Sequence, residues 1–244
     1  MKKSHTLFVI SLICFVLFFT NVKAQILLVP EIEQEKNQWC WAGVSKCVLD
    51  YYGFVEQQCD IAEYARSQNT IHFGNTNCCI SPDSCNNWNW IFGAGIGGID
   101  DILSNFGSIT TTNIYAALPE TQWQTEISNG VPVIIRYGWT GGGGHFVVGY
   151  GVQGSDYYTM DPWFNEGYTI STYNWVLTAQ GGSGDWTHTQ TLSPPLPTLI
   201  EEHSTNKELL KVTDLLGRET KGSKNEVLFY IYDDGTVEKK LIIE

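Results

Sequence analysis

The chain has 244 residues, of which 26 are acidic and 14 basic, and its formal net charge is −12 at pH 7. Such a chain lacks the basic clusters that bind nucleic-acid phosphates, so we expect no nucleic-acid partner. The basic residues are also unevenly placed. Between positions 25 and 200 they are Lys36, Lys46, Arg66 and Arg136.

Residues 1–24 are predicted to be a signal peptide. Lys2 and Lys3 precede an apolar run from Leu7 to Phe19, and Ala24 ends a small-residue cleavage site. The run is shorter than the roughly 20 residues that span a bilayer. We therefore expect a secreted mature protein without stable membrane insertion, found outside the cell or at its surface, with the periplasm as the alternative.

A helix is predicted to begin near Cys40. Val44, Cys47 and Tyr51 recur at intervals of three and four, and Gly53 suits a C-terminal cap. The Cys40 sulfur would then lie near the unpaired N–H groups and the positive end of the helix dipole. Cys47 falls on the apolar side of this helix and is expected to be a buried thiol.

The remaining elements indicate an α+β domain. Residues 61–66 and 99–106 have helical patterns, whereas residues 131–137, 145–150 and 157–160 have strand patterns joined by glycine-rich turns. Helices followed by strands are typical of the α+β class. The GxGxxG pattern at 93–98 lacks a clear βαβ context and is interpreted as a turn. We expect no cofactor.

Six cysteines follow the predicted leader, an even number that is typical of three disulfides in an exported chain. If Cys40 stays a thiol, at least one other cysteine must also be unpaired, and the pairing of the rest is left open. A zinc site is the alternative but is disfavoured because paired CxxC spacing is absent. Its ligands would be Cys59, Cys78, Cys79, Cys85 and His72. We expect no bound metal.

Cys40 and His145 are the candidate nucleophile and base. A thiolate at neutral pH usually needs a helix N-terminus and a nearby imidazolium. His145 follows four glycines and opens an apolar strand, where it would be held rigidly, whereas His188 is interpreted as a surface histidine outside any strand. Asp161 ends the next predicted strand and could orient the imidazole.

These residues, with Gln34 six positions before Cys40, resemble those of papain-like cysteine peptidases. Within that group the WCWA and His…Asp-Pro motifs are most similar to compact bacterial members, the plant-pathogen effector peptidase and the relatives of bacteriocin-processing peptidases. The resemblance covers about residues 28–165. It implies a papain-like fold, with the nucleophile at a helix start and an antiparallel sheet towards the C-terminus.

The resemblance also implies a role for each matching residue. Cys40 would be the nucleophile, His145 the base and acid, and Asp161 its orienting partner. Gln34 would donate to the oxyanion together with the Cys40 N–H, and Trp163 would shield the histidine and its acid from water. Gly43, where many relatives have alanine, and a Cys-rich insertion after the second helix depart from the family pattern.

The chain changes composition near Pro194. All nine tryptophans precede this point, and seven of the basic residues follow it. We expect a catalytic domain over 25–192, a linker over 193–206 and a small β module over 207–244. The sequence of the module resembles the C-terminal sorting domains of Bacteroidetes-type secretion, which implies the outer-membrane secretion machinery as a partner.

The sequence therefore predicts a secreted, monomeric cysteine endopeptidase that acts on protein or peptide substrates. The alternative within the enzymes is an amidase or acyl transferase with the same triad. The alternative outside the enzymes is a disulfide-stabilised binding module in which the Cys40 thiol is structural.

Overall fold

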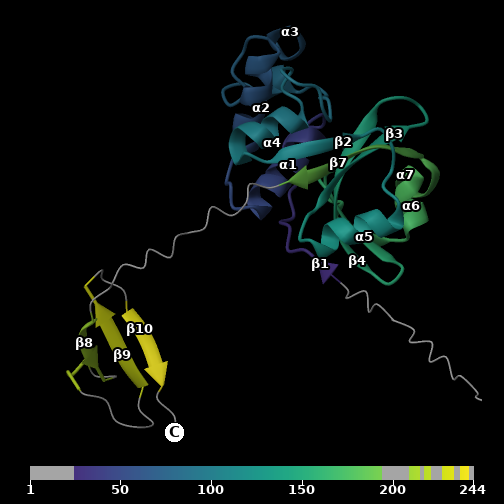
Figure 1. The fold of residues 1–244 in the computed structure, drawn as a ribbon. Helices are drawn as coiled ribbons and strands as arrows, with labels where there is room; N and C mark the ends of the chain where they lie inside the picture. Colours follow the sequence, from purple (N-terminus) through teal and green to yellow (C-terminus); the bar gives the residue numbers. More distant parts are fainter. Residues whose placement is uncertain (1–24, 194–208, 215–216, 221–226, 234–236, 242–244) are drawn as a thin grey trace, which may run out of the picture. The chain divides into compact units, whose positions relative to one another are not determined.

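The computed structural model describes two compact units that divide between Pro194 and Pro195 (Figure 1). The described residues are 25–193, 209–214, 217–220, 227–233 and 237–241. The expected signal peptide and most of the expected linker lie outside them. No helix in these ranges is both long and apolar enough to cross a bilayer.

The first unit begins with a helical part in which one central helix is almost wholly buried. This helix, α1, has eight buried residues among its 12 and packs on α2, α4 and strand β4. Figure 1 shows these helices gathered on one side of the unit. Their bounds are α1 Cys40–Tyr51, α2 Gln58–Gln68, α3 Thr70–Phe73, the 3₁₀ helix η1 Pro82–Cys85 and α4 Ile99–Gly107.

An antiparallel sheet of seven strands forms the other part of this unit. Its order is β2-β7-β3-β4-β5-β6, and β1 pairs with β4. The bounds are β1 Gln25–Ile26, β2 Thr110–Ile114, β3 Val133–Trp139, β4 Gly144–Gln153, β5 Asp156–Asp161, β6 Gly167–Ser171 and β7 Gly184–Ser193. Helices α5 Glu120–Ser128, α6 Tyr173–Leu177 and α7 Ala179–Gly182 pack against it.

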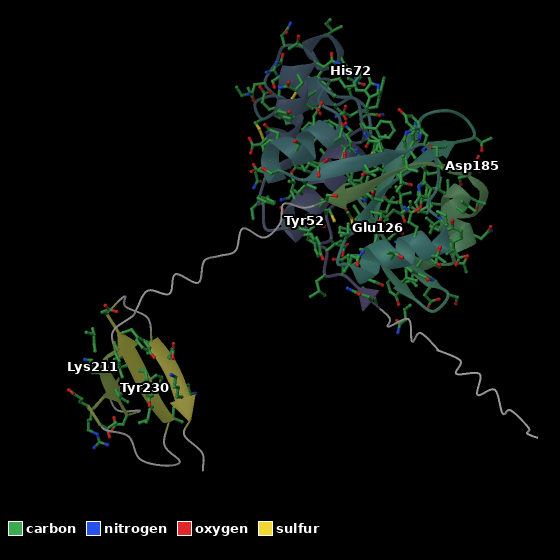
Figure 2. The ribbon with its side chains drawn as sticks, viewed as in Figure 1. Tyr52, His72, Glu126, Asp185, Lys211 and Tyr230 are labelled. Carbon is green, nitrogen blue, oxygen red and sulfur yellow. A yellow bond between two sulfur atoms is a disulfide. The ribbon has the colours of Figure 1, made fainter. Side chains whose placement is uncertain are left out.

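The end of α1 joins the helical part to the sheet part. The Tyr51 hydroxyl donates to the Gly130 carbonyl at 2.8 Å, just beyond α5. Tyr52 lies near Glu126 of α5 (Figure 2), and its pKa is raised by burial and by the charges of Tyr51 and Glu126. The two parts are therefore fixed to each other at the end of α1 opposite to Cys40.

The α+β class is confirmed, but one assignment within the sheet is wrong. His188 lies in β7, between β2 and β3, and is not a surface histidine outside a strand. The reason is that β7 is polar in sequence. Its buried Thr189 and Gln190 have hydrogen-bond partners, Ala116 and Ile91, and so occupy core positions without an apolar pattern.

Four cysteines of the helical part form two disulfides, Cys59–Cys79 and Cys78–Cys85. The four cysteines that were considered as zinc ligands are therefore all in disulfide bonds. Cys40 and Cys47 are free. Cys47 is the buried thiol that the helical pattern predicts, and burial together with the charge of Asp50 raises its pKa.

The second unit contains a small antiparallel sheet in the order β10-β9-β8. Its strands are β8 Leu209–Thr213, β9 Val227–Tyr232 and β10 Val237–Leu241. This is the all-β module that the sequence predicts. The pair Asp234-Gly235 in the sequence predicts a hairpin turn, and this pair lies outside the described residues.

Candidate active site

Cys40 is the first residue of α1 and one of the two free thiols of the helical part. No side chain caps this end of the helix, so backbone N–H groups of the first turn are available next to the sulfur. The two flanking tryptophans fix the position of the Cys40 backbone. Trp39 and Trp41 are fully buried and donate from Nε1 to the carbonyls of Cys85 and Asn87, at 3.0 and 2.9 Å.

His145 and Asp161 meet because β4 and β5 are antiparallel neighbours. Val148, three residues after His145, is paired with Met160, one residue before Asp161. The His145 Nε2 is 2.6 Å from Asp161 Oδ1, and both side chains are buried. Since Nε2 binds the carboxylate, Nδ1 is the ring nitrogen left for Cys40.

Asp161 is held by two further donors besides the imidazole. The Trp163 N–H donates to Oδ1 at 2.8 Å, and Gln180 Nε2 donates to Oδ2 at 3.0 Å. Gln180 and its neighbour Ala179 both have positive φ, 59° and 42°. Such backbone is uncommon outside glycine and clusters at functional sites.

The charged form of His145 is stabilised despite its burial. Burial alone would lower the pKa of the imidazole. Hydrogen bonds with Asp161 and Cys40 and the negative charges of both groups outweigh this effect, and the pKa of His145 is raised to about 10. Cys40, His145 and Asp161 also line one cavity, so the three side chains converge. A thiolate beside an imidazolium is the arrangement that nucleophilic cysteines use.

Residues 26–215 match the model of the Peptidase_C39 like family, and this match decides the family. The chain belongs to this family. It is therefore a cysteine peptidase, as the resemblance to papain-like peptidases implies. No curated protein sequence matches the chain.

Three solved structures of peptidases are similar to parts of the chain. A C39-like peptidase from Bacillus anthracis shares 15% identity over 71% of this chain and 100% of its own, with a TM-score of 0.48. The peptidase domain of Streptococcus ComA shares 18% over 68% and 98%, with a TM-score of 0.43. A double glycine motif protease from an AMS/PCAT transporter, in complex with its leader peptide, shares 19% over 70% and 95%, with a TM-score of 0.40.

Cys40, His145 and Asp161 border a cavity of about 590 Å³ in the peptidase. Its walls are aromatic close to the imidazole. The Trp139 ring is stacked on His145 with centroids 6.2 Å apart, and the Trp163 ring meets it edge-on at 6.1 Å. Trp163 thus lies where the resemblance implies, whereas Trp139 had no distinguishing sequence signal. Further lining residues include Trp88, Arg136, Gly144 and Gln180.

Gln34 is adjacent to the site but does not line this cavity. Its side chain is 1% exposed, and Nε2 donates to the Lys36 carbonyl at 2.8 Å. Its Oε1 has no hydrogen-bond partner. The Gln34 backbone N–H bonds to the Pro162 carbonyl at 2.7 Å, which ties this segment to the residue after Asp161.

Neither of the other described histidines reaches the site. His72 bonds the Trp88 carbonyl through Nε2 and packs among Phe73, Trp88 and Trp90. His188 is half-buried against the rings of Phe92 and Tyr115.

Proposed function

We propose that the chain is a secreted cysteine endopeptidase whose catalytic triad is Cys40, His145 and Asp161. The observation that carries this proposal is the short bond between His145 and Asp161, beside a cavity that is also lined by Cys40, a free cysteine at a helix start. No other histidine of the described residues lines the cavity that contains Cys40.

The reaction begins with attack of the Cys40 thiolate on the carbonyl carbon of a peptide bond. The Cys40 backbone N–H binds the resulting oxyanion, and the family resemblance assigns the second donor to the side-chain amide of Gln34, which lies beside the cavity. A primary amide has two N–H donors, so Gln34 can keep its bond to the Lys36 carbonyl and still supply one to the substrate. His145 gives its Nδ1 proton to the amine as the C–N bond breaks, which leaves a thioester.

Hydrolysis of the thioester completes the cycle. Water enters after the amine leaves, and neutral His145 accepts its proton as the oxygen attacks the acyl carbon. The C–S bond then breaks, and the thiolate and the imidazolium form again. Asp161 holds the ring throughout by accepting the hydrogen bond from its Nε2–H.

Peptide cleavage is tested with the mature protein and a mixture of unrelated peptides, with new termini identified by mass spectrometry. We expect internal cleavage, and Cys40→Ala should lower the rate by at least about a thousandfold. Cys47→Ala is the matched control because it removes the other free thiol, which is buried and bonded to the Pro30 carbonyl. A cleavage rate that survives Cys40→Ala would contradict the proposal.

The alternative is an amidase or acyl transferase with the same three residues. It predicts that Cys40 is acylated by small amides or esters, and that ammonia or a new amide is released, while no peptide in the mixture is cleaved. The same assay therefore separates the two, because Cys40-dependent cleavage inside peptides is expected of the endopeptidase only.

A further inference from the structure

Arg136 places a positive charge in the wall of the catalytic cavity. It lies on β3, opposite Phe146, the residue after His145. In the described part of the first unit, Arg136 is the only lysine or arginine that lines this cavity. The side chain is half-buried, and the charge of Cys40 is close enough to influence its pKa, which burial lowers and Cys40 raises.

The guanidinium is held by neutral groups alone. Nη1 donates to the Thr187 hydroxyl at 2.9 Å, and Nη2 is 3.4 Å from the Gly143 carbonyl. Gly144 makes room for it, because a Cβ at this position would lie 2.9 Å from Nη2. The four-glycine segment before His145 therefore accommodates the Arg136 guanidinium.

The other three lysine and arginine residues in the described part of this unit, residues 25–193, each have a carboxylate partner. Lys36 pairs with Asp83, Lys46 with Asp50 and Arg66 with Glu63. No ion pair within the described residues includes Arg136.

A guanidinium offers five N–H donors in a planar fork that matches a carboxylate, and most of these donors remain for a ligand here. Burying a guanidinium that has no carboxylate partner is costly, and a carboxylate on the ligand would offset this cost. Glu166 also lines the cavity, but it is exposed to solvent at the rim and forms no ion pair with Arg136.

We propose that Arg136 binds a carboxylate of the substrate beside the bond that is cleaved, so that the peptidase prefers peptides with an acidic group there. The carboxylate comes either from an aspartate or glutamate side chain or from the peptide's own C-terminus. This inference rests on the proposed function, since it names the substrate class of that site.

Matched peptides that differ by one charge test the inference. Glu and Gln are placed in turn at each of three positions on either side of the cleaved bond, and a further pair ends in a free acid or an amide. We expect kcat/KM to favour the acidic member of at least one pair by about tenfold, the effect of about 1.4 kcal/mol in a charged hydrogen-bonded pair. Preference in a Glu/Gln pair identifies a side chain, and preference in the last pair identifies the C-terminus.

Variants assign the preference to Arg136. Arg136→Gln should bring the acid-to-amide ratio close to one, and Arg136→Lys should retain part of it. Arg218→Gln removes an equal charge from an exposed position in the second unit, where Arg218 pairs with Asp214, and should leave the ratio unchanged. A ratio near one in the natural protein, or one that persists in Arg136→Gln, would overturn the inference.

The same peptide pairs, made as thiol-reactive electrophiles, keep the inference testable if no peptide is cleaved. Their rates of attachment to Cys40, followed by mass spectrometry, measure the same acid-to-amide ratio. Selective attachment without hydrolysis would mean that the endopeptidase proposal fails while the role of Arg136 holds. Attachment without selectivity would overturn the role of Arg136.

Discussion

Asp161 accepts three hydrogen bonds in a buried environment, from His145, Trp163 and Gln180. A carboxylate bound in this way stabilises the adjacent imidazolium. Because the pKa of His145 is raised from 6.5 to about 10, the charged ring persists below that pH. The corresponding contribution to folding stability is complete below about pH 6.5 and is lost as the pH rises through about 10.

Asp161→Asn should therefore move the alkaline limit of activity to lower pH. In the natural protein kcat/KM is expected to fall only as the pH approaches about 10, where His145 loses its proton. Asparagine keeps the shape of the side chain but removes the charge that raises the pKa of His145. The pH profiles of the two proteins check this, and an unchanged alkaline limit in the variant would contradict it.

Gln180 donates to Asp161, and we propose that it positions this carboxylate, a role that the sequence did not reveal. Gln180→Leu removes one donor from Asp161, and a hydrogen bond to a charged group is worth about 1.5–3 kcal/mol, so kcat should fall by at least about tenfold. We expect KM to change little and the alkaline limit to move down. Gln153→Leu, at the exposed end of β4, is the matched control. Equal effects of the two variants would show that Gln180 has no special role.

Gln34 is assigned to the oxyanion by resemblance and by its place beside the site. Gln34→Ala is expected to lower kcat by about 10²–10³, the usual effect of losing one oxyanion donor. Alkylation of Cys40 by iodoacetamide passes through no oxyanion, so its rate should be largely retained. Loss of both rates together would indicate that Gln34 supports only the local structure.

Among the elements, the Cys-rich insertion supports the start of α1. Cys85 and Asn87 supply the carbonyls that bind the indoles of Trp39 and Trp41, on either side of the nucleophile. The Cys78–Cys85 disulfide closes this segment over a sequence separation of 7, whereas Cys59–Cys79 closes a loop of separation 20. The first bridge is thus linked to the active site more directly than the second.

The two disulfides should have separable effects. In the chain-entropy model the shorter loop contributes about 2.5 kcal/mol and the longer about 3.3 kcal/mol to stability. Replacing Cys78 and Cys85 by serine should lower activity more, and replacing Cys59 and Cys79 should lower the free energy of unfolding more. Denaturant titration and peptide hydrolysis of the two double variants measure both. The reverse order in activity would contradict the supporting role.

The sequence predicted those elements whose pattern is simple. Helix α1 has a clear apolar period and begins at Cys40, and β4 and β5 are apolar runs bounded by turns. The same patterns brought His145 and Asp161 together. Strand β7 could not be recognised because Thr189 and Gln190 fill core positions. Gln180 lies in a short segment with positive φ, and no local sequence motif predicts this backbone conformation. The role of Arg136 depends on the absence of an ion-pair partner in the described part of the folded chain.

For the whole molecule, the two compact units suggest separate tasks. We propose that residues 207–244 direct secretion through the outer-membrane machinery that the sequence resemblance implies. In a bacterium with that secretion system, deleting these residues should leave active peptidase inside the cell envelope, while the natural chain appears outside. Fractionation followed by peptide hydrolysis in each fraction tests this. Export of the shortened chain at the natural level would contradict the proposal.

Iodoacetamide labelling tests the central claim most directly, because the second free cysteine, Cys47, serves as an internal standard for Cys40. At pH 7, Cys40 should be alkylated far faster than buried Cys47, and His145→Ala should remove most of that advantage because the imidazolium partner is lost. Mass spectrometry of the two cysteine peptides over time gives both rates. Equal labelling of the two cysteines in the natural protein, or a Cys40 rate unaffected by His145→Ala, would contradict the joint action of Cys40, His145 and Asp161.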